Sequence, residues 1–165
     1  MKKPKSLSPK VVELFYPLLE AEYEAFYFYR NAANYCKTIG YFKAHGFFVN
    51  ESSSELEHAS KLQEFLVDWN VLPELQKIDE PRDFKGLVDV IQAAYDMEYK
   101  LYGAYESFSL EAFRLGDVCV FDFFKEFRDI QTKAVAEYSD MLNILEGVEE
   151  DKFKLLMLEE NLFNG

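Results

Sequence analysis

A glutamate and a histidine three residues apart, Glu55 and His58, are well suited to bind a metal ion. Residues three apart on an α-helix share one face, so the carboxylate and the imidazole can reach the same point in space. Such a pair is half of a site for two metal ions inside a helical bundle. The pair is a weak indication alone, because glutamate is abundant here and an isolated histidine is more often structural. The other half of the site must come from elsewhere in the chain.

An internal repeat supplies that other half. Glu55 lies 33 residues after Glu22, and Gln131 lies 33 residues after Glu98. Each half of the chain then forms a helical hairpin, turning near residue 40 or near residue 116, and residues equally far from a turn lie level with each other. We therefore expect one polar layer across a bundle of four helices, made by Glu22, Glu55, His58, Glu98 and Gln131.

The types of these side chains predict the kind of ion. Several carboxylates buried together are costly without a cation, because they must repel each other or take up protons. Carboxylate oxygens with a single imidazole suit Fe(II), Mn(II) or Zn(II). The two cysteines, Cys36 and Cys119, lack the spacing of a zinc site, and they indicate neither an iron-sulfur site nor a disulfide framework. The pattern favours two iron ions bound by oxygen and nitrogen ligands.

The elements that must position this layer are helices. Periodic apolar residues, caps and breaks predict helices over residues 8–38, 41–70, 84–115, 117–145 and 150–162. Ser8 is placed to cap the first helix, with Pro9 at its first position. Pro17 either kinks that helix or makes residues 9–15 a separate short turn before a restart. Asp117 is the expected N-cap of the fourth helix.

The connection over residues 71–83 predicts the topology. Its 13 residues can span about 43 Å at ~3.3 Å per residue. A helix of roughly 28 residues is about 42 Å long. A connection that can cross the whole bundle indicates that the second and third long helices run parallel. The expected fold is all-α, a ferritin-like four-helix bundle with one long crossover and a short fifth C-terminal helix.

Length and composition bound the remaining possibilities. We expect residues 1–165 to form one domain with an aromatic core, because the chain holds 16 Phe and 11 Tyr. A net charge of -12 disfavours nucleic acid and anionic membrane surfaces as partners and attracts cations. No run approaches the ~18 apolar residues of a membrane span. With no signal segment recognised, we expect a cytoplasmic protein.

The sequence resembles the non-haem ferritins. The likeness is carried by Glu22, by Tyr29 seven residues later, by the segment Ser53-Ser54-Glu55-Leu56-Glu57-His58-Ala59-Ser60-Lys61-Leu62, by Glu98 and by Gln131-Thr132-Lys133-Ala134. It extends from about Ser8 to the C-terminal helix. The resemblance implies a ferroxidase that oxidises two Fe(II) per subunit with dioxygen or peroxide, and a homo-oligomeric cage of 24 subunits that stores the ferric product.

The resemblance also implies a role for each matching residue. Glu22 and His58 would bind the first iron, Glu55 would bridge, and Glu98 would bind the second iron. Gln131 would orient a water or oxygen species near the second iron. Tyr29 would hydrogen-bond to the Glu98 carboxylate.

This sequence departs from the ferritin pattern at several positions. A second Glu-x-x-His, as in bacterioferritins, is absent at Gln131 and Ala134, so no haem is expected. The third iron site of many bacterial ferritins should be missing, because its positions match Ser54, Lys133 and Ala134. In ferritins, acidic residues line a channel on the three-fold axis of the cage, and their positions match Phe121 and Phe124 here. Asp122 or Glu126 could take the place of these acids. Ser53, Ser54 and Ser60 stand where acids that seed mineral are common, so an iron-detoxifying cage with poor mineralisation is an alternative.

Three other functions compete with iron storage. A di-iron oxidase of an organic substrate usually has Glu-x-x-His on both hairpins, and Ala134 counts against it. A non-catalytic ferritin-like shell subunit would lack the ligand set. A miniature DNA-protecting cage takes its ligands from two subunits at a different spacing, which is not found here.

Overall fold

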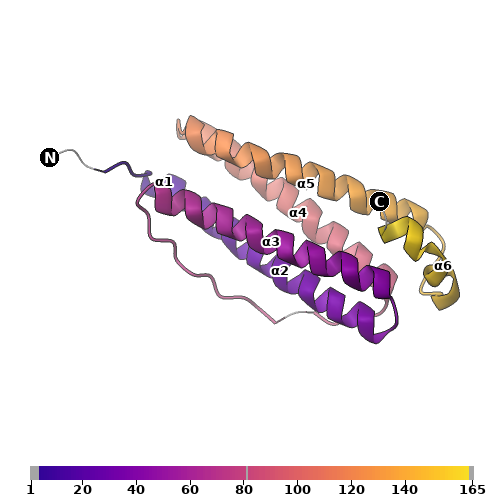
Figure 1. Ribbon diagram of the computed structural model, residues 1–165. Coiled ribbons are helices and arrows are strands. Elements are labelled where there is room, and N and C mark those ends of the chain that lie inside the picture. Colours follow the sequence, from indigo (N-terminus) through magenta and orange to yellow (C-terminus); the bar gives the residue numbers. More distant parts are fainter. Residues whose placement is uncertain (1–3, 81, 164–165) are drawn as a thin grey trace.

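The computed structural model describes residues 4–80 and 82–163, and in these residues all regular secondary structure is helical. Four long helices lie side by side as two hairpins, with short helices at the N-terminal and C-terminal ends (Figure 1). This arrangement is the predicted all-α four-helix bundle. The helices are α1 (Pro9–Val12), α2 (Phe15–Thr38), α3 (Phe42–Asp68), α4 (Leu87–Arg114), α5 (Val118–Ile144) and α6 (Lys152–Phe163).

The region predicted as one helix over residues 8–38 is split in two. Ser8 caps α1 by accepting a hydrogen bond from the Val11 backbone N–H at 3.3 Å, and Pro9 is its first residue. The chain then turns at Glu13 and Leu14 before α2 begins. Pro17 is the third residue of α2, where its missing N–H has no partner to lose. The restart, and not the kink, is therefore the observed alternative.

Two tight turns close the hairpins. Gly40 between α2 and α3 has φ +86°, and Gly116 between α4 and α5 has φ +78°. These left-handed conformations favour glycine, which has no Cβ to clash. The Asp117 side chain caps α5 by accepting a hydrogen bond from the Val120 N–H at 2.9 Å. Each long helix lies inside the range predicted from the sequence.

A long connection, described over residues 69–80 and 82–86, joins the two hairpins. It runs along the outside of the bundle from the end of α3 to the opposite end of the molecule, where α4 begins (Figure 1). Helices α3 and α4 therefore run parallel, while α2 with α3 and α4 with α5 are antiparallel. This is the single long crossover that the length of the connection predicted.

The apolar core consists of two clusters, one toward each end of the bundle. One cluster includes Tyr29, Phe48 and Tyr138, and it extends to α6. The other includes Phe15, Leu62 and further aromatic residues near α1. Between the two clusters, at the middle of the long helices, lie buried polar side chains, among them Glu22, Glu55, Glu98 and Gln131. The core thus leaves one polar layer across the bundle.

Helix α6 packs against the beginning of α3 and caps it. Oε2 of Glu159 accepts hydrogen bonds from the backbone N–H groups of Lys43 and Ala44, each at 3.1 Å. A carboxylate at a helix N-terminus also interacts favourably with the helix dipole. In residues 4–80 and 82–163, no helix is both long and apolar enough to cross a membrane.

Candidate metal centre

The structure brings the five predicted residues to one level of the bundle. Glu22 comes from α2, Glu55 and His58 from α3, Glu98 from α4 and Gln131 from α5. All five are buried or nearly so, and the side chain of His58 keeps 12% of its surface exposed. A polar layer of this kind inside an aromatic core has a large desolvation cost unless its charges are compensated.

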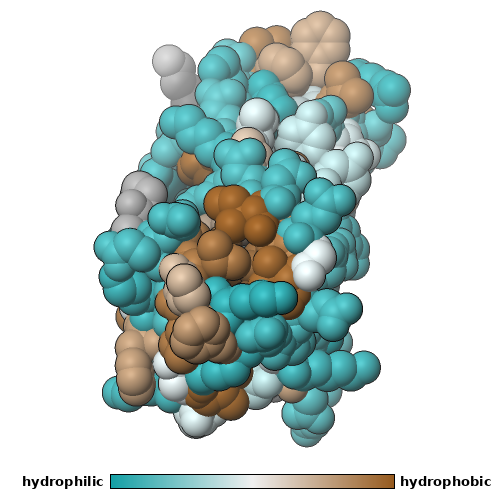
Figure 2. All heavy atoms as spheres, turned by 90° about the vertical axis from the view of Figure 1, so that its right-hand side faces the viewer, coloured by the Kyte–Doolittle hydropathy of each residue, from teal (hydrophilic) through white to brown (hydrophobic). Residues whose placement is uncertain are grey.

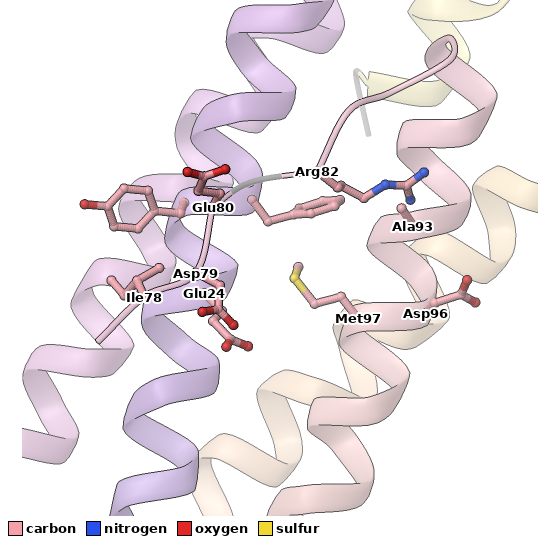
Figure 3. Close-up of a pocket in the computed structure, with 10 residues that line it drawn as sticks. Glu24, Ile78, Asp79, Glu80, Arg82, Ala93, Asp96 and Met97 are labelled. Atoms are coloured by element: carbon pink, nitrogen blue, oxygen red, sulfur yellow. The ribbon is translucent and has the colours of Figure 1, made fainter. Parts of the chain in front are cut away.

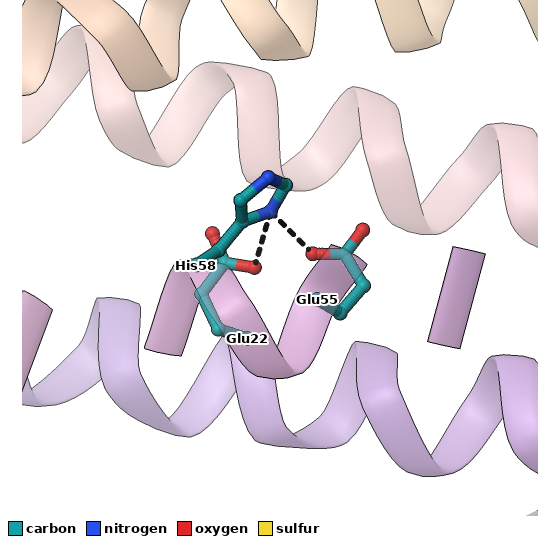
Figure 4. Close-up of side chains that lie close together, drawn as sticks. All are labelled: Glu22, Glu55 and His58. Atoms are coloured by element: carbon teal, nitrogen blue, oxygen red, sulfur yellow. Dashed lines mark hydrogen bonds and ion pairs between the residues drawn. The ribbon is translucent and has the colours of Figure 1, made fainter. Parts of the chain in front are cut away.

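The first group able to hold a metal ion consists of Glu22, Glu55 and His58. Nδ1 of His58 lies 2.9 Å from Oε2 of Glu55 and 3.5 Å from Oε2 of Glu22. The three side chains come from α2 and α3 and point toward one another (Figure 4). Two carboxylates and one imidazole at these distances can surround a single divalent cation.

The second such group consists of Glu51, Glu55 and Glu98, so Glu55 belongs to both. In each group, one ligand atom of every member lies within 4.8 Å of the others. Two cations held by these two groups would share the Glu55 carboxylate.

Two tyrosines hydrogen-bond crosswise between the hairpins. The hydroxyl of Tyr29 on α2 donates to Oε1 of Glu98 on α4 at 2.5 Å. The hydroxyl of Tyr105 on α4 donates to Oε1 of Glu22 on α2 at 2.5 Å. Both tyrosines are completely buried. Each carboxylate is therefore held in orientation by the hairpin that does not carry it.

Gln131 also acts on Glu98. Its Nε2 donates to Oε2 of Glu98 at 2.6 Å and to the Glu98 backbone carbonyl at 3.3 Å. Both carboxylate oxygens of Glu98 thus accept a hydrogen bond, one from Gln131 and one from Tyr29. In the protein without metal, Gln131 orients Glu98.

The protonation of this cluster reflects burial and mutual repulsion. Burial raises the pKa of Glu55 well above its usual value, and the neighbouring Glu22 and Glu98 raise it further. Burial also acts to raise the pKa of Glu22, but the interactions with the neighbouring Glu55 and His58 outweigh it and lower that pKa. Burial would lower the pKa of His58, yet Glu22 and Glu98 raise it. Without metal, these shifts favour protons on Glu55 and His58, which reduce the negative charge of the cluster.

One carboxylate oxygen of the cluster is available to a cation. Oε2 of Glu22 is completely buried, and Nδ1 of His58, 3.5 Å away, makes no well-formed hydrogen bond with it. A buried carboxylate oxygen without a well-formed hydrogen bond is destabilising. It belongs to the first metal group, where a bound cation would satisfy it. The donor set and this oxygen both fit a divalent metal.

Two residues of the site were missed by the sequence interpretation, and each had a signal. Tyr105 lies seven residues after Glu98, as Tyr29 lies seven residues after Glu22, so the internal repeat extends to the tyrosines. Glu51 lies four residues before Glu55 and so shares its face of α3. The short spacing alone could not distinguish Glu51 from a solvated glutamate.

The residues that depart from the expected pattern take other places. Ser54 and Lys133 are exposed and Ala134 is half-buried, and none of them belongs to either metal group. Phe124 is completely buried in the core. The ring of Phe121 lies against the Arg128 guanidinium at 4.6 Å. Phe124 is therefore a core residue of the subunit in this structure.

Two surface grooves run between α2 and α4, away from the metal groups. One has a volume of about 320 Å³ and lies beneath the long connection, where Glu24, Asp79, Asp96 and Met97 line it (Figure 3). The adjoining groove, about 560 Å³, is lined by Glu24 and Lys100 among others. None of the candidate metal ligands lines either groove.

Comparisons with known proteins agree with this fold. The family model described as "Ferritin-like domain" matches residues 13–148. A bacterial non-heme ferritin of Staphylococcus aureus (strain MRSA252) is 23% identical over 157 residues, 94% of this chain and 95% of the relative. A probable bacterial non-heme ferritin-like protein of Haemophilus influenzae is 23% identical over 159 residues, 96% of each chain.

Solved structures show the same architecture. An open pore ferritin from the archaeon Archaeoglobus fulgidus superimposes with a TM-score of 0.88 at 24% identity, over 94% of this chain and 96% of that one. A humanized archaeal ferritin gives a TM-score of 0.89 at 25% identity, over 95% and 97%.

Proposed function

This chain belongs to the ferritin family, and we propose that it oxidises Fe(II) to Fe(III) and deposits the iron inside a hollow homo-oligomeric shell. Glu22 and His58 hold the first Fe(II), Glu98 holds the second, and Glu55 bridges them. Each Fe(II) gives one electron, and two electrons with two protons reduce one dioxygen to hydrogen peroxide. The same two electrons and two protons reduce one peroxide to two water molecules. Iron is the substrate and the cargo.

This proposal rests mainly on Glu55, whose carboxylate belongs to both groups of side chains that could hold a metal ion. A two-electron oxidant needs two Fe(II) ions close together, because each ion supplies only one electron. A shared carboxylate holds the two ions as neighbours. The pair of buried positions at the middle of one subunit supports a reaction that occurs within each subunit.

The donor atoms support iron over other cargo. The ligand atoms are carboxylate oxygens and one imidazole nitrogen, with no thiolate in either group. Such a mixed set suits Fe(II) and leaves positions open for an oxidant. The hydroxyl groups of Tyr29 and Tyr105, which hydrogen-bond to Glu98 and Glu22, keep the carboxylates oriented while the charge on the ions changes.

Exposed apolar side chains in three separate places support a shell. One is Leu72 with Leu75 on the long connection, and another is Leu110 with Phe113 near the end of α4. The third is on α6, whose end of the molecule carries a visible hydrophobic patch (Figure 2). A closed shell with cubic symmetry needs contacts around more than one kind of axis. We propose that 24 copies assemble through these three surfaces.

The surface of α3 beside the centre bears on the fate of the ferric product. Ser53, Ser54 and Ser60 are exposed there, and a hydroxyl binds ferric iron more weakly than a carboxylate does. We therefore propose that oxidation is efficient and that growth of the mineral is slower. The amount of iron that stays with the shell through gel filtration measures mineral growth separately from oxidation.

The surroundings of the centre favour iron oxidation over oxidation of an organic substrate. The side chains of Glu22, Glu55 and Glu98 are each exposed by 3% or less. Neither of the two grooves between α2 and α4 reaches these residues. An organic molecule needs space beside the metal ions, whereas iron and dioxygen need only a narrow path.

Rapid mixing of the metal-free protein with two Fe(II) per chain, followed by oxygen, tests the proposed reaction. We expect fast formation of Fe(III), and a loss of more than about tenfold in rate in His58→Ala and Glu55→Ala. Glu57→Gln, a change of an exposed acid on the same helix, is the matched control. Light scattering measures the assembly of each variant. Equal oxidation rates in the assembled variants and the wild type would refute the proposed site.

A further inference from the structure

Glu51 places an additional carboxylate at the second cation position. It lies one helical turn before Glu55 on α3, and its side chain is half-buried. One oxygen each from Glu51, Glu55 and Glu98 lie within 4.8 Å of one another. Carboxylate oxygens bound to one ion at about 2.0 to 2.2 Å lie at most about 4.4 Å apart. The three side chains are thus within a small movement of sharing one cation.

We propose that Glu51 is a ligand of the second metal position, which becomes a site of three carboxylates. The inference rests on the proposed function, because it concerns the same two-metal centre. It makes the two positions chemically different. The first has an imidazole, whereas the second has oxygen ligands only.

The charge around Glu51 supports a cation there. Across residues 4–80 and 82–163, no lysine, arginine or histidine forms an ion pair with Glu51. Among its charged neighbours, Glu137 and Glu98 are negative and act on Glu51 more strongly than His58, which acts in the opposite direction. A half-buried carboxylate among other carboxylates is destabilised unless a proton or a metal ion compensates it.

A second, independent observation comes from Tyr138 on α5. Its hydroxyl is completely buried and makes no well-formed hydrogen bond among the described residues, although the Tyr29 hydroxyl is close enough to lower its pKa. Glu51 is the charged group that acts on it most strongly, ahead of Glu98 and Glu137. A buried hydroxyl without a well-formed hydrogen bond is destabilising. A hydrated cation held by Glu51 would supply an acceptor for the Tyr138 hydroxyl.

Zn(II), which has no redox chemistry, is the probe that separates binding from oxidation. Calorimetric titration of the assembled protein should give two Zn(II) per chain in the wild type and in the control Glu57→Gln. In Glu51→Gln we expect the second ion to bind at least about tenfold more weakly, with the first ion unchanged. If both ions bind equally well to Glu51→Gln and to the wild type, the assignment of Glu51 as a ligand is overturned, while the proposed two-metal function is not.

Two further results keep the tests of site and residue distinct. In a crystal structure of the wild type with Zn(II), a Glu51 oxygen should lie about 2.0 to 2.2 Å from the second ion. A Glu51 side chain turned away from that ion would overturn the inference without any variant. Binding of fewer than two ions by the wild type would overturn both the inference and the proposed two-metal function.

Discussion

The hydroxyl of Tyr105 on α4 donates a hydrogen bond to Oε1 of Glu22 on α2, at 2.5 Å. The reverse bond, from Tyr29 on α2 to Glu98 on α4, has the same length. These two helices belong to different hairpins, so each hairpin fixes a carboxylate of the other. The crossed pair ties the orientation of both candidate metal positions to the packing of the two hairpins.

Replacing Tyr105 by phenylalanine tests this relationship at the first metal position. Phenylalanine keeps the stacking on Phe127, whose ring centroid lies 5.1 Å away, and removes only the hydroxyl. Removing a hydrogen-bond partner of this kind typically lowers metal affinity about 10- to 100-fold. We expect Zn(II) titration to show this loss at the position that contains Glu22.

Tyr29→Phe is the matched control, since its hydroxyl contacts Glu98 instead. It should weaken the second ion and leave the first unchanged. Identical titrations of Tyr105→Phe and the wild type would show that Glu22 is held without Tyr105.

Replacing Glu55 by glutamine should stabilise the metal-free protein. Burial and two neighbouring carboxylates raise the pKa of Glu55 well above its usual value, so its charged form is unfavourable in the fold. Near neutral pH we expect the free energy of unfolding to rise by about 1 kcal/mol, or roughly 2 to 4 °C in the melting temperature. Scanning calorimetry of metal-free Glu55→Gln and wild type measures the difference. A lower melting temperature would mean that the carboxyl group is needed even without metal.

The stability of the metal-free protein should fall as the pH rises from about 4.5 to 7. Burial, with the charges of Glu137 and Glu98, raises the pKa of Glu51 from 4.5 to about 7. A raised pKa means that the folded state binds the proton more tightly than the unfolded state does. This contribution is fully present below pH 4.5 and is lost as the pH passes through 7. Its size is on the order of 1 to 3 kcal/mol.

Glu51→Gln should reduce this loss, because glutamine does not titrate. Melting temperatures of both proteins between pH 4.5 and 7.5, with a chelator present, measure it. An equally steep decline in the two proteins would assign the pH dependence to other groups.

A charge on the exposed face of α6 should disrupt assembly. Phe153 is 73% exposed and Met157 is 68% exposed, so neither is needed for the fold of one subunit. A buried charge at an apolar contact is strongly unfavourable. We expect Phe153→Glu and Met157→Glu to yield particles smaller than the wild type by light scattering, with unchanged helical circular dichroism. Lys154→Glu, an exposed change on the same helix, is the control, and full-size particles from all three variants would exclude α6 from the interface.

Pro17→Ala should destabilise the protein only slightly. Pro17 lies in the first turn of α2, where no backbone hydrogen bond is lost, and proline restricts the unfolded chain. We expect a loss of about 0.4 to 1 kcal/mol in the free energy of unfolding. A gain in stability would indicate that Pro17 strains α2.

The sequence by itself determined the level of the candidate ligands along the bundle. Helical rise is uniform, so the equal spacing of Glu22 to Glu55 and of Glu98 to Gln131 required only the positions of two turns. The length of the connection predicted the parallel run of α3 and α4 in the same way. These are distances along the chain, which do not depend on how side chains pack.

The tertiary structure decided which side chains meet across the hairpins. The rotation of each helix and the rotamers of its side chains follow from packing in the two apolar clusters, which local spacing does not contain. Only this packing placed the Tyr105 hydroxyl on Glu22 and brought Glu51 beside Glu98. It also buried Phe124 in the core and placed Glu159 at the start of α3. The sequence thus set the height of the centre, and packing set its contacts.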